Sequence, residues 1–227
     1  MSQIQYFAIV RHGDYYQIPD TPSANQPYAL TPEGEAQAKQ CAGYIAQFCQ
    51  DKIIKVQFPL HSSASLRAWQ TASLAGAELG FREKPVETYA LGERSVGSMA
   101  NLTIEEINRA LSSDPRYPTP PDNWKSDSHY RLPYPGAESL LQAGQRVADY
   151  ITDVLHTSDS ELLPVFFGHG ASFRHAMFHL GILSLDEAKA RSMYHAKPIF
   201  FCRKAGGAWQ HIAGEWKPRS KGQKEMD

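Results

Sequence analysis

The 227-residue chain has few cysteines, no strong excess of charge of either sign and no long apolar run. Its three cysteines, Cys41, Cys49 and Cys202, are too few and odd in number for a disulfide framework, which favours a reducing compartment. A formal net charge of -1 gives no sign of a surface for nucleic acid or a membrane. No run is long enough to cross a bilayer, and the first residues do not resemble a signal peptide. We therefore expect a soluble cytoplasmic protein that binds neither nucleic acid nor a membrane.

Apolar runs alternate with helical patterns along the chain. The runs predict strands at 6–10, 56–60, 86–90 and 162–167, and a hairpin formed by 199–202 and 209–212. Helices are predicted after Thr31-Pro32-Glu33, through 67–79, after the Thr103/Glu106 capping box, and from Leu140 to Val154. This alternation indicates a three-layer α/β/α sandwich with a mostly parallel central sheet. We expect one domain over 1–216 and a disordered basic tail over 217–227.

Polar signatures stand where the predicted strands end. These are Arg11-His12-Gly13, the segment around Glu93, and Gly168-His169-Gly170, while Arg67 begins the helix after the second strand. In open α/β sheets, sites form beyond the carboxyl ends of the strands. We therefore expect two histidines, two arginines and a glutamate to meet in one crevice.

This set of side chains suits phosphoryl transfer. The guanidinium groups of Arg11 and Arg67 can hold a phosphate dianion with paired hydrogen bonds, and His169 can donate another. Such donors stabilise the charge that spreads over the equatorial oxygens, in place of a metal ion. Neighbouring arginines should keep His12 neutral near pH 7, as a nucleophile must be. Glu93 is suited to protonate the leaving oxygen and then to activate water.

An ordered series of motifs resembles the histidine phosphatase superfamily, in its branch with cofactor-dependent phosphoglycerate mutase and the fructose-2,6-bisphosphatases. The series is Ile9 to Gly13, Leu30 to Gly34, Ser63 to Ala72, Glu93-Arg94 with Gly97, Pro135 to Leu140, and Gly168-His169-Gly170. A lone Arg-His-Gly triplet is weak evidence, but the ordered series runs through nearly the whole chain. The resemblance implies a phosphoglycerate mutase-like fold and a phosphohistidine at His12. It further implies phosphate contacts from Arg11, Arg67 and His169, and Glu93 as the proton donor.

Two departures from the family pattern bear on the substrate. Asp14 stands where a Glu or Gln is common, and an inward acidic side chain would repel strongly anionic substrates. Phosphoglycerate mutases carry a close pair of arginines for the substrate's second anionic group, whereas 110–121 offers only Arg116, with Arg109 just before it. The missing arginine pair weakens the mutase interpretation. We therefore expect a metal-independent phosphatase without a cofactor, acting on a phosphorylated small molecule or a phosphoprotein. Arg94, Gly170 and Asp14 are predicted substrate contacts.

Several alternatives remain open at this stage. A mutase would use the same intermediate and depend on a bisphosphate primer, and a non-catalytic phosphoprotein-binding module would be expected to have lost His12 or Arg67. Glu87 competes with Glu93 as the acid. The alternative role of Arg94 is an ordinary salt bridge, and the alternative role of Asp14 is to cap a turn.

Two further segments have competing interpretations, and the assembly is open. His175 and His179 have a zinc-compatible spacing, but without supporting ligands a structural role is the better interpretation. The loop 114–136 is interpreted as a substrate-selecting insert, in preference to the alternative of a passive surface loop. A single chain and an oligomer are both compatible with these patterns.

Overall fold

The computed structural model describes residues 4–219. The strands are β1 (Ile4–Arg11), β2 (Lys55–Val56), β3 (His61–Ser63), β4 (Val86–Thr88), β5 (Leu162–Leu163), β6 (Val165–Gly168), β7 (Arg191–Met193), β8 (Ile199–Lys204), β9 (Gln210–Ala213) and β10 (Trp216–Pro218). The helices are α1 (Pro32–Lys52), α2 (Leu66–Glu78), α3 (Ile104–Ser113), α4 (Leu140–Thr157), α5 (Gly170–His179) and α6 (Leu185–Ala190), with 3-10 turns at Tyr89–Leu91 and Gly97–Met99.

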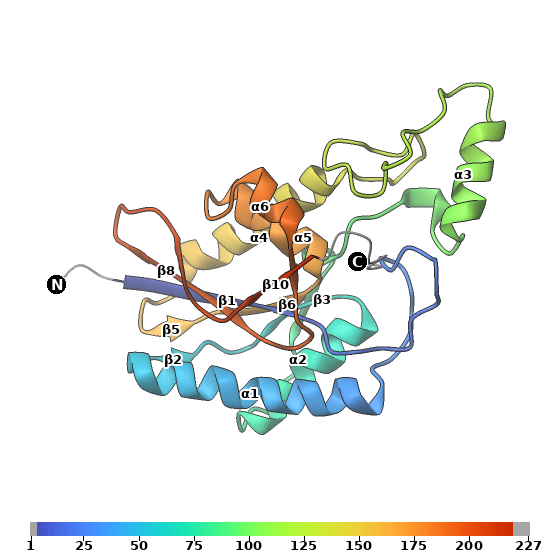
Figure 1. Cartoon of the computed structure of the whole chain (residues 1–227). Coiled ribbons are helices and arrows are strands. Elements are labelled where there is room, and N and C mark those ends of the chain that lie inside the picture. The colour runs from blue at the N-terminus through green and yellow to red at the C-terminus, as the bar shows by residue number, and fades with distance from the viewer. Residues whose placement is uncertain (1–3, 220–227) are drawn as a thin grey trace.

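Within this part of the chain, a six-stranded sheet runs in the order β4-β3-β6-β1-β8-β9. The pairs β4/β3, β3/β6 and β6/β1 are parallel, whereas β8 and β9 join as antiparallel strands. Helices α1 and α2 cover one face, and α4 and α5 cover the other (Figure 1). The predicted three-layer sandwich with a mostly parallel sheet is confirmed.

The central strand β1 is buried on both faces. Phe7 and Ile9 belong to the apolar core beneath α4 and α5, whereas Ala8 and Val10 belong to the core beneath α1 and α2. This division follows from the two-residue period of a strand. A continuous apolar run is therefore what a central parallel strand needs.

Local capping signals were good guides to the helices. Thr31 Oγ1 accepts the Gly34 N–H at 3.1 Å, with Pro32 as the first residue of α1. Thr103 and Glu106 form the predicted capping box of α3, and Ser139 with Gln142 forms another at the start of α4. The predicted hairpin exists as β8 and β9.

Two strand predictions were displaced. The run 56–60 does not form one strand: β2 ends at Val56, and the strand of the main sheet lies at His61–Ser63. The predicted strand 162–167 is divided at Pro164 into β5 and β6, because proline has no N–H for the ladder. Apolar content marked the neighbourhood of these strands but not their bounds.

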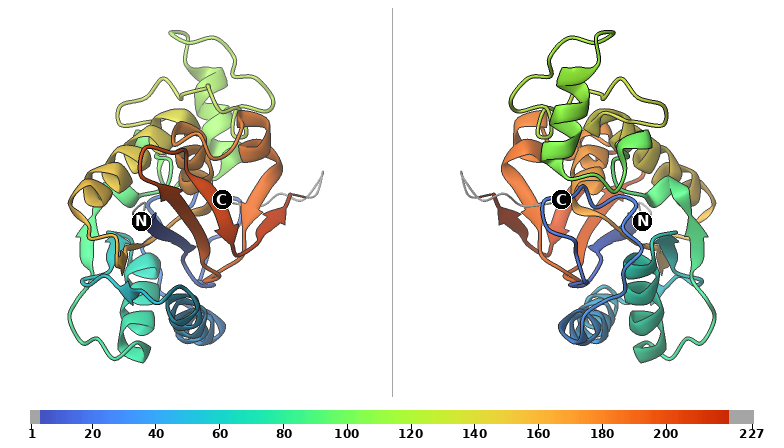
Figure 2. Two further views of the ribbon diagram at one scale, coloured as in Figure 1. Left: turned by 90° about the vertical axis from the view of Figure 1, so that its left-hand side faces the viewer. Right: turned by 90° about the vertical axis from the view of Figure 1, so that its right-hand side faces the viewer.

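Helix α3 and the loop after it form a cap at one end of the molecule, above the sheet in both views of Figure 2. No helix or strand occurs at 114–136 within this described segment, as expected. The cap has its own apolar cluster, which includes Ile107, Leu111, Trp124 and Leu132. The Trp124 indole N–H also donates to Asn108 Oδ1 at 2.8 Å. The loop is therefore anchored to the rest of the cap through buried side chains such as Trp124 and Leu132.

The predicted tail begins too early. Lys217 and Pro218 lie in β10, which pairs with β7, and the Arg219 N–H donates to the Ala190 carbonyl at 3.0 Å. The disorder predicted from Lys217 is thus wrong for 217–219, because these residues complete a small ladder. The rest of the predicted tail, 220–227, lies outside the described residues. Among the helices of 4–219, none has the length and apolar character needed to cross a membrane.

Candidate active site

His12 and His169 lie side by side because their strands are neighbours. Strands β1 and β6 are parallel, with Arg11 paired to Gly168, so each strand ends just before its histidine. The backbone N–H of His12 donates to the Gly168 carbonyl at 3.0 Å. The two imidazole rings meet edge to face with centroids 5.2 Å apart. The structure thus brings both predicted histidines to one point on the sheet edge.

The hydrogen bond of His12 identifies its reactive nitrogen. His12 Nδ1 lies 2.8 Å from the Gly13 carbonyl oxygen, which can only accept, so Nδ1 carries the proton. In the neutral ring, Nε2 then holds the lone pair. Burial, followed by electrostatic interactions with Arg67, His169, Arg11 and His195, holds the pKa of His12 well below its usual value. His12 is therefore neutral at pH 7 and has a nucleophilic Nε2.

Arg67 is fully buried and its guanidinium is held by the loop before α1. Nη1 donates to the Gln26 carbonyl at 3.0 Å, and Nη2 donates to the Ser23 carbonyl at 2.9 Å. The guanidinium also lies over the Tyr15 ring, 4.6 Å from its centroid. Arg67 Nε has no hydrogen-bond partner among residues 4–219. This donor is buried at the site and can serve an anionic ligand.

His169 is neutral in this arrangement, and its tautomer follows from its partners. Arg67 Nη2 lies 3.2 Å from His169 Nδ1, and a guanidinium can only donate, so Nδ1 accepts. Nε2 consequently bears the proton and donates to Ser63 Oγ at 3.0 Å, with Ser65 Oγ at 3.3 Å. Burial, then Arg67 and Arg11, lowers the pKa of His169 well below its usual value. Ser63 and Ser65 lay within a recognised motif, but the sequence did not assign them a role.

Glu93 is buried beside the start of α5. Its Oε1 accepts hydrogen bonds from the backbone N–H groups of Arg94 and Ser172 at 2.8 and 3.0 Å. Its Oε2 accepts one from the backbone N–H of Ala171 at 3.1 Å. The competing candidate Glu87 is exposed on β4, at the edge of the sheet. The geometry therefore places Glu93, and not Glu87, near His169.

A side chain of α2 fixes the turn that carries His12. Thr71 Oγ1 donates to the Arg67 carbonyl at 2.7 Å and accepts the Gly13 N–H at 2.9 Å. The same turn lies against the first turn of α1, so close that a Cβ on Gly13 would stand 2.6 Å from the Gly34 carbonyl oxygen. Two recognised motifs thus meet through a glycine-to-glycine contact.

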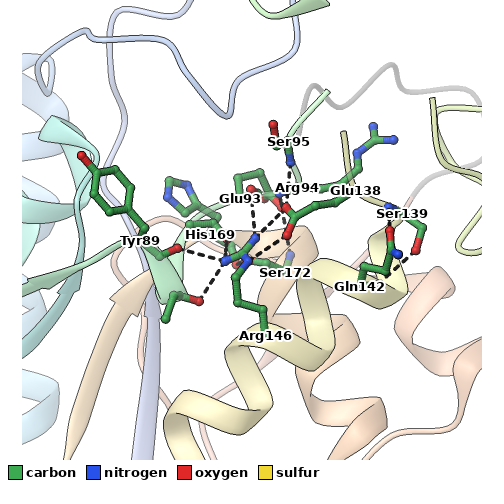
Figure 3. A network of polar contacts seen from close by, with 12 residues as sticks. Tyr89, Glu93, Arg94, Ser95, Glu138, Ser139, Gln142, Arg146, His169 and Ser172 are labelled. Atoms are coloured by element: carbon green, nitrogen blue, oxygen red, sulfur yellow. Dashed lines mark hydrogen bonds and ion pairs between the residues drawn. The ribbon is translucent and has the colours of Figure 1, made fainter. Parts of the chain in front are cut away.

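A pocket of about 620 Å³ opens beside Glu93, lined also by Gln26, Ser63, Ser65 and Tyr89. Arg146 also lines this pocket and reaches from α4 toward Glu138 and the carbonyl of Tyr89 (Figure 3). Arg146 Nη2 contacts Glu138 Oε2 at 2.8 Å, and Nη1 donates to three carbonyls, those of Tyr89, Ala90 and Gly92. The positive charge that Arg146 brings to the pocket is therefore already paired.

The predicted substrate contacts occupy different places. Arg94 lies against the Trp124 ring, 5.6 Å from its centroid, and lines a separate cavity of about 50 Å³ instead of the pocket beside Glu93. Gly170 begins α5, directly after His169. Asp14 Oδ2 accepts from Thr31 Oγ1 at 2.7 Å, next to the site. Arg94 is thus separated from the Glu93 pocket, while the substrate roles of all three stay predictions.

The two histidines with zinc-compatible spacing bond to protein groups. His175 Nε2 lies 3.0 Å from Ser128 Oγ, and its Nδ1 lies 2.8 Å from the Ala171 carbonyl. His179 Nε2 lies 2.9 Å from the Leu141 carbonyl. His175 thus ties α5 to the cap.

His195 is a neighbour of His12 that sequence reasoning missed. Their rings stack with centroids 5.7 Å apart and an interplanar angle of 29°. His195 follows β7 and belongs to no recognised motif, so only the crossing of the chain from β7 to β8 brings it here. No local signal could have indicated it.

Known proteins resemble this chain in sequence and in fold. Residues 7–209 match the family model of the histidine phosphatase superfamily (branch 1). A 2,3-bisphosphoglycerate-dependent phosphoglycerate mutase of Parvibaculum lavamentivorans is 26% identical over 150 residues, covering 62% of this chain and 65% of that protein, slightly less than two thirds of its length.

Solved structures share the fold. A mycobacterial glucosyl-3-phosphoglycerate phosphatase superposes with a TM-score of 0.69 at 17% identity, covering 95% of this chain and 100% of the other. Bacillus stearothermophilus YhfR also superposes with a TM-score of 0.69, at 20% identity, covering 95% of this chain and 98% of the other. At such identities these structures show a common fold alone.

Proposed function

The chain belongs to the histidine phosphatase superfamily, and from that premise we propose that it is a metal-independent phosphatase that hydrolyses phosphomonoesters through a phosphohistidine on His12. The observation that carries the proposal is the hydrogen bond from His12 Nδ1 to the Gly13 carbonyl. This bond leaves an unprotonated Nε2 in a buried site that also holds Arg67 and His169. Members of the family are phosphatases or mutases, and both begin with this nucleophile.

In the first step, His12 Nε2 attacks phosphorus and the bond to the ester oxygen breaks. Glu93, protonated at that moment, gives its proton to the departing alkoxide, so the product is a neutral alcohol. Charge on the three equatorial oxygens is stabilised by donors from Arg11 and Arg67, and by His169 once its Nε2–H turns from Ser63 Oγ to a phosphoryl oxygen. Arg67 is already fixed by two carbonyls, so little reorganisation accompanies the reaction.

In the second step, water replaces the imidazole on phosphorus. The Glu93 carboxylate accepts a proton from the attacking water, the P–N bond breaks, and inorganic phosphate leaves. Glu93 ends protonated and His12 ends neutral, as both began. The cycle therefore needs no group beyond the substrate and water.

The pocket beside Glu93 supports hydrolysis over mutase chemistry. Among its lining residues, all within 4–219, Arg146 is the only cation, and it is paired with Glu138. The two arginines at 109 and 116 do not line this pocket. Arg109 pairs with Glu105 and Arg116 pairs with Asp114, and the side chains of both arginines are strongly exposed. A substrate with one phosphate on a neutral alcohol fits this pocket better than a phosphoglycerate.

The mutase remains the second candidate because a curated relative carries that name. A mutase would return the phosphoryl group to the substrate at another position, and its rate would depend on a bisphosphate primer. Phosphate release without primer favours the phosphatase. Primer-dependent isomerisation with little release would favour the mutase.

The first test is phosphate release from p-nitrophenyl phosphate in EDTA, with wild type, His12→Ala and Tyr44→Phe as an exposed control. We expect EDTA-resistant turnover in the wild type and the control, and loss of about 10³-fold or more in His12→Ala. Rapid quenching should trap phosphate on the wild-type protein in an acid-labile linkage. Turnover that EDTA abolishes, or that survives His12→Ala, would show the proposal to be wrong.

A further inference from the structure

Glu93 lies on a segment that has little secondary structure of its own. The 3-10 turn Tyr89–Leu91 precedes it, and residues 92–95 belong to no helix or strand. The carboxylate is anchored by backbone N–H groups at the start of α5, but those bonds do not hold the chain that leads to it. The distance from the acid to a leaving oxygen therefore depends on the contacts that fix this backbone.

The guanidinium of Arg146 fixes that backbone from helix α4. Its Nη1 donates to three carbonyls of the segment, at 3.1 Å to Tyr89, 2.8 Å to Ala90 and 3.2 Å to Gly92 (Figure 3). Its Nη2 reaches the carbonyl of Glu93 itself at 3.5 Å. A guanidinium presents its N–H donors in one rigid plane, so the carbonyls that it binds are held relative to one another. One side chain thus ties the segment together from the 3-10 turn to the acid.

Arg146 is itself held in place. Glu138 accepts its Nε–H at 2.9 Å and its Nη2–H at 2.8 Å, the paired geometry that gives strong hydrogen bonds. The backbone N–H of Glu138 also donates to the Ser95 carbonyl at 2.9 Å, just beyond Glu93. The exposed fractions of the Arg146 and Glu138 side chains are 28% and 23%, so most of this network is shielded from water. Arg146 is therefore a fixed support and not a mobile surface cation.

We propose that Arg146 is a positioning residue for the proton donor: its bonds to the carbonyls before Glu93 keep the Glu93 carboxyl group within reach of the leaving oxygen. The inference rests on the proposed phosphatase function. In the step concerned, a proton passes from Glu93 to the ester oxygen as the P–O bond breaks, and Arg146 neither gains nor loses a proton. Arg146 lines the same pocket, but its donors are engaged by Glu138 and by carbonyls, so it acts through Glu93.

The consequence is a loss of activity that depends on the leaving group. A misplaced acid matters only where the leaving oxygen is strongly basic, because an acidic phenol departs without a proton. Arg146→Gln should therefore lower kcat/KM by roughly 10- to 100-fold for ethyl phosphate, and by less than about 3-fold for p-nitrophenyl phosphate. The ratio kcat/KM is compared because it covers the steps up to release of the alcohol. A purely structural role would reduce the amount of active protein, and so lower the rates of both substrates equally.

A double-mutant cycle with Glu93→Gln tests whether Arg146 acts through the acid. Substitutions of residues that act through one another have non-additive effects, whereas those of independent residues add. In the Glu93→Gln background, Arg146→Gln should therefore lower kcat/KM for ethyl phosphate by less than about 3-fold. Arg146→Lys keeps a charge beside Glu138 but lacks the planar fork. It should show the same selectivity with a smaller loss, and it takes the place of Arg146→Gln if that variant does not fold.

Gln145→Ala is the matched control on the same helix, because Gln145 is exposed and donates to Asp149 at 2.7 Å. It should turn over both substrates as wild type does. Equal losses of both substrates in the Arg146 variants, or a cycle in which the two substitutions add fully, would overturn the inference. If the wild type shows His12-dependent turnover while either result holds, only the role of Arg146 is lost. If the wild type releases phosphate from neither substrate, the proposed function fails, and the inference fails with it.

Discussion

At the scale of single residues, Glu93 has two roles that the contacts alone do not separate. It accepts two amide N–H groups from the first turn of α5, which is a capping role, and it lines the pocket where a leaving group would lie. A proton donor matters most when the leaving oxygen is strongly basic. Glu93→Gln should therefore lower kcat/KM by about 10²- to 10⁴-fold for alkyl phosphates and much less for aryl phosphates of acidic phenols. Initial rates over a leaving-group series measure this.

Glu138→Gln is the matched control for this prediction. Glu138 lines the same pocket, but its carboxylate is paired with Arg146 and so is not placed to give a proton. Its substitution should change all substrates by a similar factor. If Glu93→Gln also showed equal losses for alkyl and aryl phosphates, Glu93 would be only a cap of α5, and the acid would have to be sought elsewhere.

At the scale of elements, the site depends on the contact between the turn after β1 and the first turn of α1. A Cβ on Gly34 would overlap the carbonyl oxygen of Asp14, so Gly34→Ala must push the two turns apart. We expect a loss of about 1–3 kcal/mol in the free energy of unfolding, the usual cost of overpacking, and reduced kcat because the His12 turn moves. Urea unfolding and the aryl phosphate assay measure the two effects.

The same helix offers a control at Gly43, where an added Cβ meets nothing within 4 Å. Gly43→Ala should raise the free energy of unfolding by about 0.5–1 kcal/mol, through the helix propensity of alanine, and leave kcat unchanged. If Gly34→Ala were as harmless as Gly43→Ala, this contact would not fix the site.

Elements with local signals were predictable, and elements set by distant contacts were not. Helix α1 could be placed from Thr31 and Pro32 because a cap and a fixed φ are properties of neighbouring residues. Strand β3 could not, because it buries Ser62 and Ser63, whose hydroxyls are satisfied by hydrogen bonds. The apolar pattern therefore predicted a strand at 56–60, just before the strand of the main sheet at His61–Ser63.

The same distinction applies to the site. His12 and His169 could be predicted to meet because parallel strands bring their carboxyl ends to one edge. The packing of Arg94 on Trp124 depends on how the cap loop folds back, which has no periodic signal. The contact of His195 with His12 depends on the crossing of the chain from β7 to β8.

At the scale of the whole molecule, four buried histidines make the fold sensitive to acid: His12, His61, His169 and His175. Burial lowers the pKa of His61 to about 4, and His61 Nδ1 lies 2.9 Å from the Tyr150 hydroxyl. Burial likewise lowers the pKa of His175 to about 4, where it joins α5 to Ser128 of the cap. In the unfolded chain these rings would titrate near 6.5. Between about pH 6.5 and 4 the unfolded state therefore binds more protons than the folded state.

The free energy of unfolding must consequently fall as the pH is lowered through that window, by up to about 1.4 kcal/mol per pH unit for each ring. His12 and His169 add to the slope, since their pKa values are also depressed. Urea denaturation at several pH values between 7 and 4.5 measures it. His61→Gln keeps a hydrogen-bonding group beside Tyr150. It should reduce the dependence of the free energy of unfolding on pH by up to the contribution of one proton. Substitution of the exposed His211 by glutamine should leave the slope of the wild type. If the free energy of unfolding of the wild type did not change over this window, these imidazoles would have to be accessible to protons in the folded state, contrary to their burial.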